Sequence, residues 1–156
     1  MFDPFGHLLN LVDKAFDDVP RPTGDYFDWF PGTRDPRDTE LESAARWQEI
    51  PEPSLRGVET WFLGEATDAV QMYLFPALMT AWLRGGSDGQ VFVTVVSVEN
   101  NVSPSFLESL TVDQARVIGL FLALYCLEDA AFLPVEESLD RALALWFERV
   151  AKARAR

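Results

Sequence analysis

A proline inside one of the most apolar stretches of the chain limits the folds that the sequence allows. The stretch is Tyr73–Arg84, YLFPALMTAWLR, and the proline is Pro76. Because proline lacks a backbone N–H and fixes φ, it is costly inside a helix and favourable in a first helical turn. The sequence therefore predicts a helical segment ending near Met72 or Tyr73, a bend, and a second helix beginning at about Pro76. We expect the other elements to pack around this bend.

Composition indicates a folded domain with an acidic surface. The 156 residues are 48% apolar and include 12 Phe and 5 Trp, which is ample material for one core. The 13 Lys and Arg against 25 Asp and Glu give a net charge of −12. Nucleic acids and anionic membranes attract cationic surfaces, so neither is an expected partner, whereas a basic protein is. We predict one mainly α-helical domain over residues 1–156.

Cysteine usage and the chain's first residues favour a cytoplasmic location. Cys126 is the single cysteine, so an internal disulfide is excluded and a reducing compartment is expected. The first residues, MFDPFGHLLNLV, include Asp3 and no basic residue, unlike a signal peptide. Charged residues interrupt every apolar run before the roughly 20 residues of a membrane span. Residues 149–156 carry four basic residues and no acid, which suits a helix C-terminus.

Apolar spacing, capping boxes and prolines signal helices over most of the chain. The helices predicted in this way cover residues 4–18, 40–49 (capping box Thr39 and Glu42), 54–64 (cap Ser54), 112–129 (capping box Thr111 and Gln114) and a last helix from Pro134. The RGGSDG sequence that begins at Arg84 predicts a helix stop followed by a turn.

One segment, residues 91–98, carries a β-like signal. Its sequence VFVTVVSV is rich in β-branched residues, and intrinsic preference therefore favours a strand. No second run in the chain resembles it, so a strand here would lack an obvious partner. A buried helical turn and an edge hairpin both stay open for this segment.

Residues 20–38 are predicted to form a long loop rich in proline and aromatic residues. Long connections without regular structure are uncommon in compact domains and are often functional. In one interpretation the aromatic side chains cover the core as a packed flap. In the other they form an exposed, acid-flanked patch that binds a protein partner. The candidate partner-binding residues are Asp25, Tyr26, Phe27, Asp28, Trp29 and Phe30.

Residues suited to catalysis or metal binding are scarce. With one histidine, His7, and one cysteine, a zinc site with nitrogen and sulfur ligands is excluded. Adjacent acidic pairs on a helix point about 100° apart, so they do not converge on Mg²⁺ or Ca²⁺. Cys126 lies among apolar and acidic residues, which disfavour a reactive thiolate. We predict no catalytic residue, no metal and no cofactor.

Four short segments together are similar to a family of small bacterial proteins of unknown function. They are AFDDV, RWQEIP, MYLFPALM and LTVDQ, and they span roughly residues 15–127. The shared pattern is Ala-Phe-x-x-Val, Trp-x-x-Ile/Leu-Pro, Tyr-x-x-Pro-Ala-x-Met and Leu-Thr-x-x-Gln. Phe75 and Leu78 depart from the pattern at the bend. The resemblance implies a mainly helical single domain and supplies no catalytic residues.

These observations lead to two functional hypotheses. The first is a non-enzymatic cytoplasmic domain whose acidic surface binds another protein, with an immunity- or antitoxin-like role by analogy. The second is a carboxylate-based hydrolase or transferase with a cleft beside the 73–84 bend.

Overall fold

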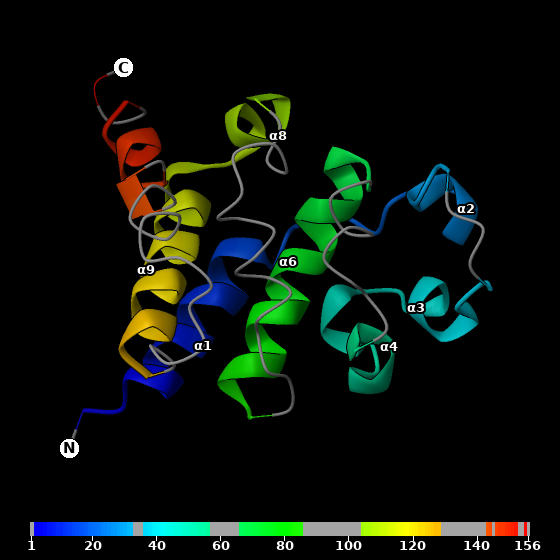
Figure 1. Ribbon diagram of the computed structural model, residues 1–156, viewed down its shortest axis with the longest axis horizontal. Helices are drawn as coiled ribbons and strands as arrows, with labels where there is room; N and C mark the ends of the chain where they lie inside the picture. Colours follow the sequence, from blue (N-terminus) through cyan, green and yellow to red (C-terminus); the bar gives the residue numbers. More distant parts are fainter. Residues whose placement is uncertain are drawn as a thin grey trace. The chain divides into compact units, whose positions relative to one another are not determined.

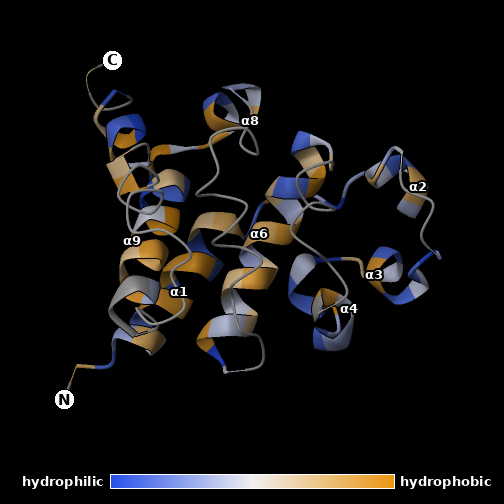
Figure 2. Cartoon of the chain, viewed as in Figure 1, coloured by the Kyte–Doolittle hydropathy of each residue, from blue (hydrophilic) through white to orange (hydrophobic). Residues whose placement is uncertain are grey.

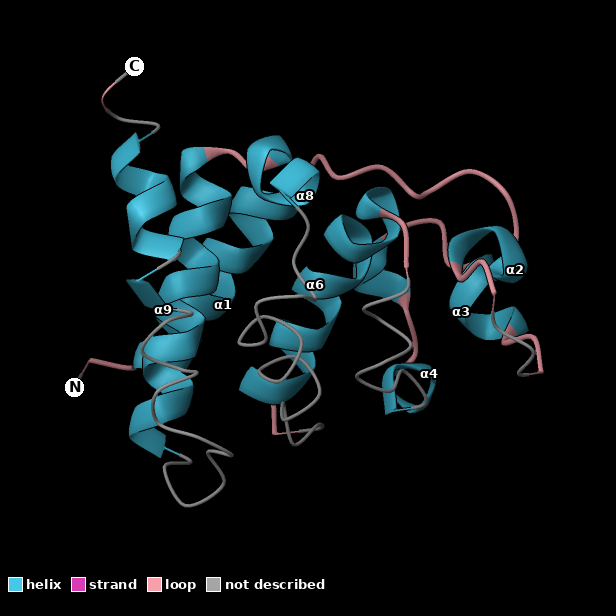
Figure 3. Cartoon of the chain, turned by 45° about the horizontal axis from the view of Figure 1, so that its top comes forward, coloured by secondary structure: helices cyan, strands magenta, loops and turns pink. Residues whose placement is uncertain are grey.

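The fold of the described residues is helical, as the sequence predicts. The computed structural model describes residues 2–32, 36–56, 66–85, 104–128, 143–144, 146–152 and 155. Within these residues the regular structure consists of helices, and no strand occurs (Figures 1 and 3). The predictions for residues 91–98, for the end of the helix from Ser54 and for the helix start at Pro134 lie outside the described residues.

The chain divides into two compact units. Unit 1 comprises Met1–Asp17 and Val96–Arg156, and unit 2 comprises Asp18–Val95. Each unit is described by itself below, and the prediction of one domain over 1–156 stays a prediction.

In unit 1, the first helix follows its predicted pattern closely. Helix α1 spans Pro4–Phe16, and the Oδ1 atom of Asp3 caps it by accepting the N–H of Gly6 at 3.1 Å. Leu8, Val12 and Phe16 recur every four residues and are buried, so one stripe of the helix faces the core. This stripe packs against α9, the long helix Val112–Glu128.

The start of α9 confirms the predicted capping box. Thr111 Oγ1 accepts the backbone N–H of Gln114 at 3.1 Å, and Gln114 Oε1 accepts the backbone N–H of Thr111 at 3.0 Å. Gln114 Nε2 also donates to the carbonyl of Ala15 at 3.1 Å. The same side chain therefore begins α9 and ties it to the end of α1. Most of α9 is coloured on the hydrophobic side of the scale in Figure 2, in agreement with its buried position.

The short helix α8, Pro104–Ser109, is fastened to the C-terminal part of unit 1 by an arginine. Residues 146–152 are helical. From this helix Arg149 donates to the carbonyls of Leu107 and Leu110, both at 2.9 Å, and of Glu108 at 3.4 Å. A cation beside the carbonyls at a helix C-terminus is favourable because it satisfies acceptors that lack helical partners.

In unit 2, the central element is one helix, and the predicted bend is wrong. Helix α6 spans Asp68–Leu83 and includes Pro76 in its interior (Figure 1). An interior proline costs roughly 3 kcal/mol because its N–H is missing and its ring crowds the preceding turn. Twelve residues of α6 are buried, and a buried large apolar side chain contributes about 1.5–3 kcal/mol. Burial on all sides therefore outweighs the proline.

Both ends of α6 use ordinary capping chemistry. Thr67 Oγ1 accepts the N–H of Val70 at 3.4 Å at the start. At the end, Gly85 has φ of +79° and donates its N–H to the carbonyl of Trp82 at 2.9 Å. The left-handed backbone at Gly85 is the conformation that glycine adopts without strain. The helix stop predicted from the RGG sequence is confirmed at this position.

The predicted helix over 40–49 is replaced by shorter elements. Helix α3 spans Thr39–Ser43, and its cap is Asp38, whose Oδ1 atom accepts the N–H of Leu41 at 2.8 Å. The backbone becomes extended at Ala44, with ψ of 129°, and the 3₁₀ turn η1 follows at Trp47–Glu49. The carbonyl of Ala44 accepts the hydroxyl of Tyr73 at 3.1 Å. Contacts distant in sequence thus compete with continuation of the helix.

Two further contacts complete the described core of unit 2. Helix α4, Glu52–Arg56, begins two residues before the predicted cap Ser54 and packs against α3 and α6. The turn η1 also packs against α6, through the buried Trp47. Among the helices of the described residues, none combines the length and the apolar composition that a bilayer span requires.

Candidate protein-binding surface

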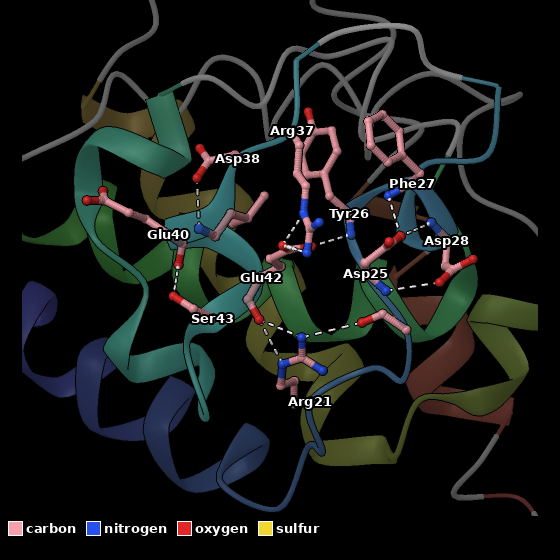
Figure 4. Close-up of polar contacts among 12 residues, drawn as sticks. Arg21, Asp25, Tyr26, Phe27, Asp28, Arg37, Asp38, Glu40, Glu42 and Ser43 are labelled. Carbon is pink, nitrogen blue, oxygen red and sulfur yellow. Dashed lines mark hydrogen bonds and ion pairs between the residues drawn. The ribbon is translucent and has the colours of Figure 1, made fainter.

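The predicted loop over 20–38 contains a short helix, α2, at Tyr26–Trp29. Asp25 caps it, because its Oδ1 atom accepts the N–H groups of Phe27 at 3.0 Å and Asp28 at 3.2 Å. Asp28 reciprocates, since its Oδ2 atom accepts the N–H of Asp25 at 3.0 Å (Figure 4). These bonds form a capping box at the start of α2. A helix of four residues is not stable by itself, so the capping box helps to keep it folded.

The six candidate partner-binding residues differ in exposure, and Asp25 is half-buried. Tyr26, Trp29 and Phe30 are buried, as the packed-flap interpretation expects. Phe27 is 46% exposed, and Asp28 is also exposed. The spacing explains the division, because residues at i, i+3 and i+4 share one helix face and residue i+1 lies off it.

The buried aromatic side chains pack against one another and against α6. The ring centroids of Tyr26 and Phe30 are 5.1 Å apart, and those of Trp29 and Tyr73 are 5.7 Å apart in an edge-on arrangement. The indole N–H of Trp29 donates to the carbonyl of Thr23 at 3.1 Å. Aromatic pairs in this geometry are favourable beyond their buried area, so α2 is held firmly on the core of unit 2.

Glu42 is the residue that the sequence analysis placed in the wrong role. Its buried carboxylate does not serve the predicted capping box but accepts the backbone N–H of Tyr26 through Oε2 at 2.6 Å. Its Oε1 atom pairs with the guanidinium of Arg37, whose side chain is about half exposed. Because Tyr26 lies sixteen residues from Glu42 in sequence, no local spacing signals this contact.

Arg21, which precedes α2 in the chain, connects the segment before α2 to α3. Its Nε and Nη2 atoms donate to the carbonyl of Glu42 at 2.9 and 2.5 Å, and Nη1 donates to the carbonyl of Pro22 at 2.8 Å. The guanidinium carbon lies 4.9 Å from the ring centroid of Trp29. Such a cation–aromatic contact adds stability when it is partly desolvated. Figure 4 shows Arg21 and Arg37 approaching Glu42 from different segments.

Two pKa shifts follow from this packing. The hydrogen bond to Glu42 raises the pKa of Arg37, so its guanidinium stays charged in the ion pair. Burial raises the pKa of Tyr73 to about 12, although the positive charge of Arg21 acts in the opposite direction. The Tyr73 hydroxyl therefore stays neutral at ordinary pH and remains the donor to Ala44.

At the start of α2, the exposed Phe27 stands in sequence between Asp25 and Asp28, whose carboxylates form the capping box. Phe27 lies edge-on against the buried Tyr26, with ring centroids 5.7 Å apart. Contact with Tyr26 therefore helps to fix the orientation of the Phe27 ring. Asp25 and Asp28 accept hydrogen bonds from backbone amides at the start of α2. A ring and two carboxylates can bind a cation on an aliphatic stem, through contact with the ring and charge pairing.

The other two residues that the sequence analysis considered for chemistry, His7 and Cys126, belong to unit 1. His7 is exposed on α1, and its ring centroid is 5.6 Å from that of Phe2. The side chain of Cys126 lies outside the described residues. In the part of the chain that the structure describes, no group of three or more His, Cys, Asp or Glu residues could hold a metal ion.

The 73–84 stretch, beside which the enzyme hypothesis places a cleft, is buried helix over most of its length. Tyr73 to Met79 and Ala81 to Leu83 are buried, and Thr80 is half-buried. These side chains pack the core of unit 2. The hydrolase or transferase hypothesis stays a prediction.

Comparison with known proteins finds no match, since no family model, no curated protein and no solved structure is significantly similar to the chain. The similarity to a family of small bacterial proteins therefore stays a prediction based on the four segments.

Proposed function

We propose that this chain is a non-enzymatic protein-binding domain that recognises a basic segment of a partner protein through the outward side of α2. The observation that carries the proposal is the exposed Phe27 between Asp25 and Asp28. We name these three residues the α2 surface.

The α2 surface combines the features of a small recognition site. An exposed aromatic residue loses unfavourable contact with water when a partner covers it. The capping box and the buried Tyr26 hold the ring in place before binding, which lowers the entropy lost on association. The net charge of −12 attracts basic partners over longer distances and raises the association rate.

The single Cys126 favours a reducing compartment, the family resemblance implies a bacterial protein, and an immunity or antitoxin role follows by analogy. This setting rests on the family resemblance and on analogy. The binding proposal itself rests on the α2 surface and holds for any basic partner.

The test is affinity capture from lysate of the native host, with the full chain as bait, at low and at high salt. We expect a basic protein that the wild type retains at low salt and releases at high salt, because salt screens charge pairing. Phe27→Ser should abolish its capture. Asp28→Asn should weaken capture, because the amide oxygen can still accept the Asp25 N–H while the negative charge is lost.

Matched controls separate this site from general effects of exposure and charge. Phe2→Ser removes another exposed phenylalanine, and Asp18→Asn removes another exposed carboxylate of unit 2. Both controls should retain the partner. The proposal is wrong if wild type and Phe27→Ser retain the same proteins, or if nothing is captured at either salt.

A further inference from the structure

We propose that Arg37 is an internal competitor of the partner at the α2 surface. In the chain without its partner, the guanidinium of Arg37 occupies the position beside Glu42 that a cation of the basic segment would otherwise take. This inference rests on the proposed function, because it concerns the regulation of the same site. It implies that the wild type binds a basic segment less tightly than the carboxylates alone would.

Glu42 links Arg37 to α2. The two oxygens of its buried carboxylate have different partners, because Oε2 accepts the backbone N–H of Tyr26 at 2.6 Å and Oε1 pairs with the guanidinium of Arg37. Tyr26 stands between Asp25 and Phe27 in the chain. One carboxylate therefore holds a cation from the segment before α3 beside the α2 surface, and Figure 4 shows Arg37, Tyr26 and Asp25 around Glu42.

Arg37 forms the outer part of this ion pair. Its side chain is 48% exposed, whereas that of Glu42 is 7% exposed, so the guanidinium shields the Glu42 carboxylate from other cations. The hydrogen bond with Glu42 raises the pKa of Arg37, and the negative charge of Asp25 acts in the same direction. A carboxylate of the α2 surface thus attracts the cation that already pairs with Glu42.

A tethered cation competes strongly with a free one. Arg37 lies five residues from Glu42 in the same chain, so its effective concentration at the carboxylate is on the order of millimolar or more. A partner that offers one lysine or arginine gains little by displacing it. A segment with several cations can pair with the exposed Asp28 and also compete at Glu42. The proposal therefore narrows the partner to a segment with more than one basic residue.

The test is the affinity of the full chain for a tri-arginine peptide with blocked ends, at physiological ionic strength. Nuclear magnetic resonance follows the backbone amide signal of Asp28, which reports on the α2 surface itself. We expect Arg37→Gln to bind the peptide about two- to fivefold more tightly than the wild type, since a surface ion pair changes a binding constant on this scale. Arg37→Lys keeps the charge and should bind as the wild type does.

Arg84→Gln is the control for the loss of one positive charge. Arg84 is exposed and follows the last residue of α6, whereas Thr67, at the other end, donates its N–H to the carbonyl of Trp29 in α2 at 3.4 Å. The sixteen residues of α6 separate its two ends by about 24 Å, and charges are screened beyond about 8 Å at this ionic strength. The control should therefore bind as the wild type does.

Substitution of Glu42 tests whether the cations compete at this carboxylate. In Glu42→Gln the amide oxygen can still accept the Tyr26 N–H, but Arg37 is freed to pair with Asp25, so we expect weaker binding of the peptide. Adding Arg37→Gln removes the competitor and should restore the affinity of the wild type. This comparison leaves no buried carboxylate without a partner, so it holds even if Arg37→Gln alone unfolds. A double variant that binds no better than Glu42→Gln contradicts the competition.

The outcomes separate this inference from the proposed function. If Phe27→Ser loses the peptide while Arg37→Gln binds it no more tightly than the wild type, the internal competition is overturned and the α2 surface stands. Equal tightening by Arg37→Gln and Arg84→Gln also overturns the competition, because the gain then reflects net charge alone. If the wild type and all variants fail to bind, or if Phe27→Ser binds as the wild type does, both proposals fail.

Discussion

The carboxylate of Glu42 accepts the backbone N–H of Tyr26 at 2.6 Å, across sixteen residues of sequence. This bond connects α3 to the first residue of α2 and is buried. It satisfies the donor of a helix start that has no partner within the helix. The candidate binding surface on α2 thus depends on Glu42, which belongs to α3 and is buried, so that it is not part of the surface itself.

Replacing Glu42 tests this dependence. Glu42→Ala leaves the buried Tyr26 N–H without its acceptor, and we expect a loss of about 1–3 kcal/mol in the free energy of unfolding. Glu42→Gln keeps an acceptor oxygen and should cost less. Urea unfolding of both variants measures the difference. Glu40→Ala is the control and should change stability little, because this glutamate of α3 is exposed. Equal stability of wild type and Glu42→Ala would contradict a structural role for the bond.

Removing the interior proline should stabilise unit 2. Pro76→Ala restores an N–H that can donate to the carbonyl of Met72, and an interior proline costs roughly 3 kcal/mol. Part of this gain is lost, because alanine buries less surface and leaves the unfolded chain more flexible. We expect a net stabilisation of about 1 kcal/mol, measured by urea unfolding. A destabilised variant would show that the local helix geometry around Pro76 is required for packing.

A substitution near the C-terminal end of α6 tests how much this helix contributes to the stability of the core. Trp82 is buried, so Trp82→Ala should cost about 3–5 kcal/mol. Thermal unfolding followed by circular dichroism at 222 nm measures the change. Arg84→Ala, two residues further and exposed, is the matched control and should melt within a few degrees of the wild type. A Trp82→Ala variant that melts with the control would place this part of α6 outside the core.

The titration of Tyr73 should appear in the stability of the protein at alkaline pH. Its pKa is raised to about 12 in the folded chain, from the ordinary value of 10.0. The folded state therefore holds the proton more strongly than the unfolded state does. The contribution is fully present below about pH 10 and is lost as the pH rises towards about 12.

Comparison of wild type and Tyr73→Phe measures this contribution. Urea unfolding at several values between about pH 9 and about pH 11 should show a steeper decline for the wild type, because the variant lacks the titrating group. The variant should be less stable near neutral pH by about 1 kcal/mol, since the bond to the Ala44 carbonyl is lost. Identical slopes would contradict the raised pKa of Tyr73.

Local signals in the sequence predicted α1 and α9 of unit 1 well, whereas α8 was not predicted. The stripe of Leu8, Val12 and Phe16 places α1, and the capping box of Thr111 and Gln114 places the start of α9. These signals succeed because a helix start and a helix face depend on residues three or four positions apart. The same logic divides the aromatic residues of α2, since the spacing of Tyr26 and Trp29 puts both on the inner face.

Local signals failed where a distant partner offered a better contact. Glu42 has the spacing of a capping box with Thr39, yet Asp38 caps α3 and the Glu42 carboxylate binds Tyr26 and Arg37 instead. Pro76 has the signature of a helix start, yet α6 continues through it. In both cases the free energy of tertiary contacts exceeds the local preference, which amounts to no more than a few kcal/mol.

The sequence by itself determined the helical class of the described residues, the extents of α1 and α9, and the acidic charge, because these follow from composition and from contacts within one or two helical turns. The tertiary structure decided that α6 is one helix, that Glu42 supports α2, and that the α2 face with Tyr26 and Trp29 is the one that packs on the core. These outcomes depend on the free energy of burial and on hydrogen bonds between residues far apart in the chain. Such contacts exist only once the elements have packed, and spacing along the sequence does not encode them.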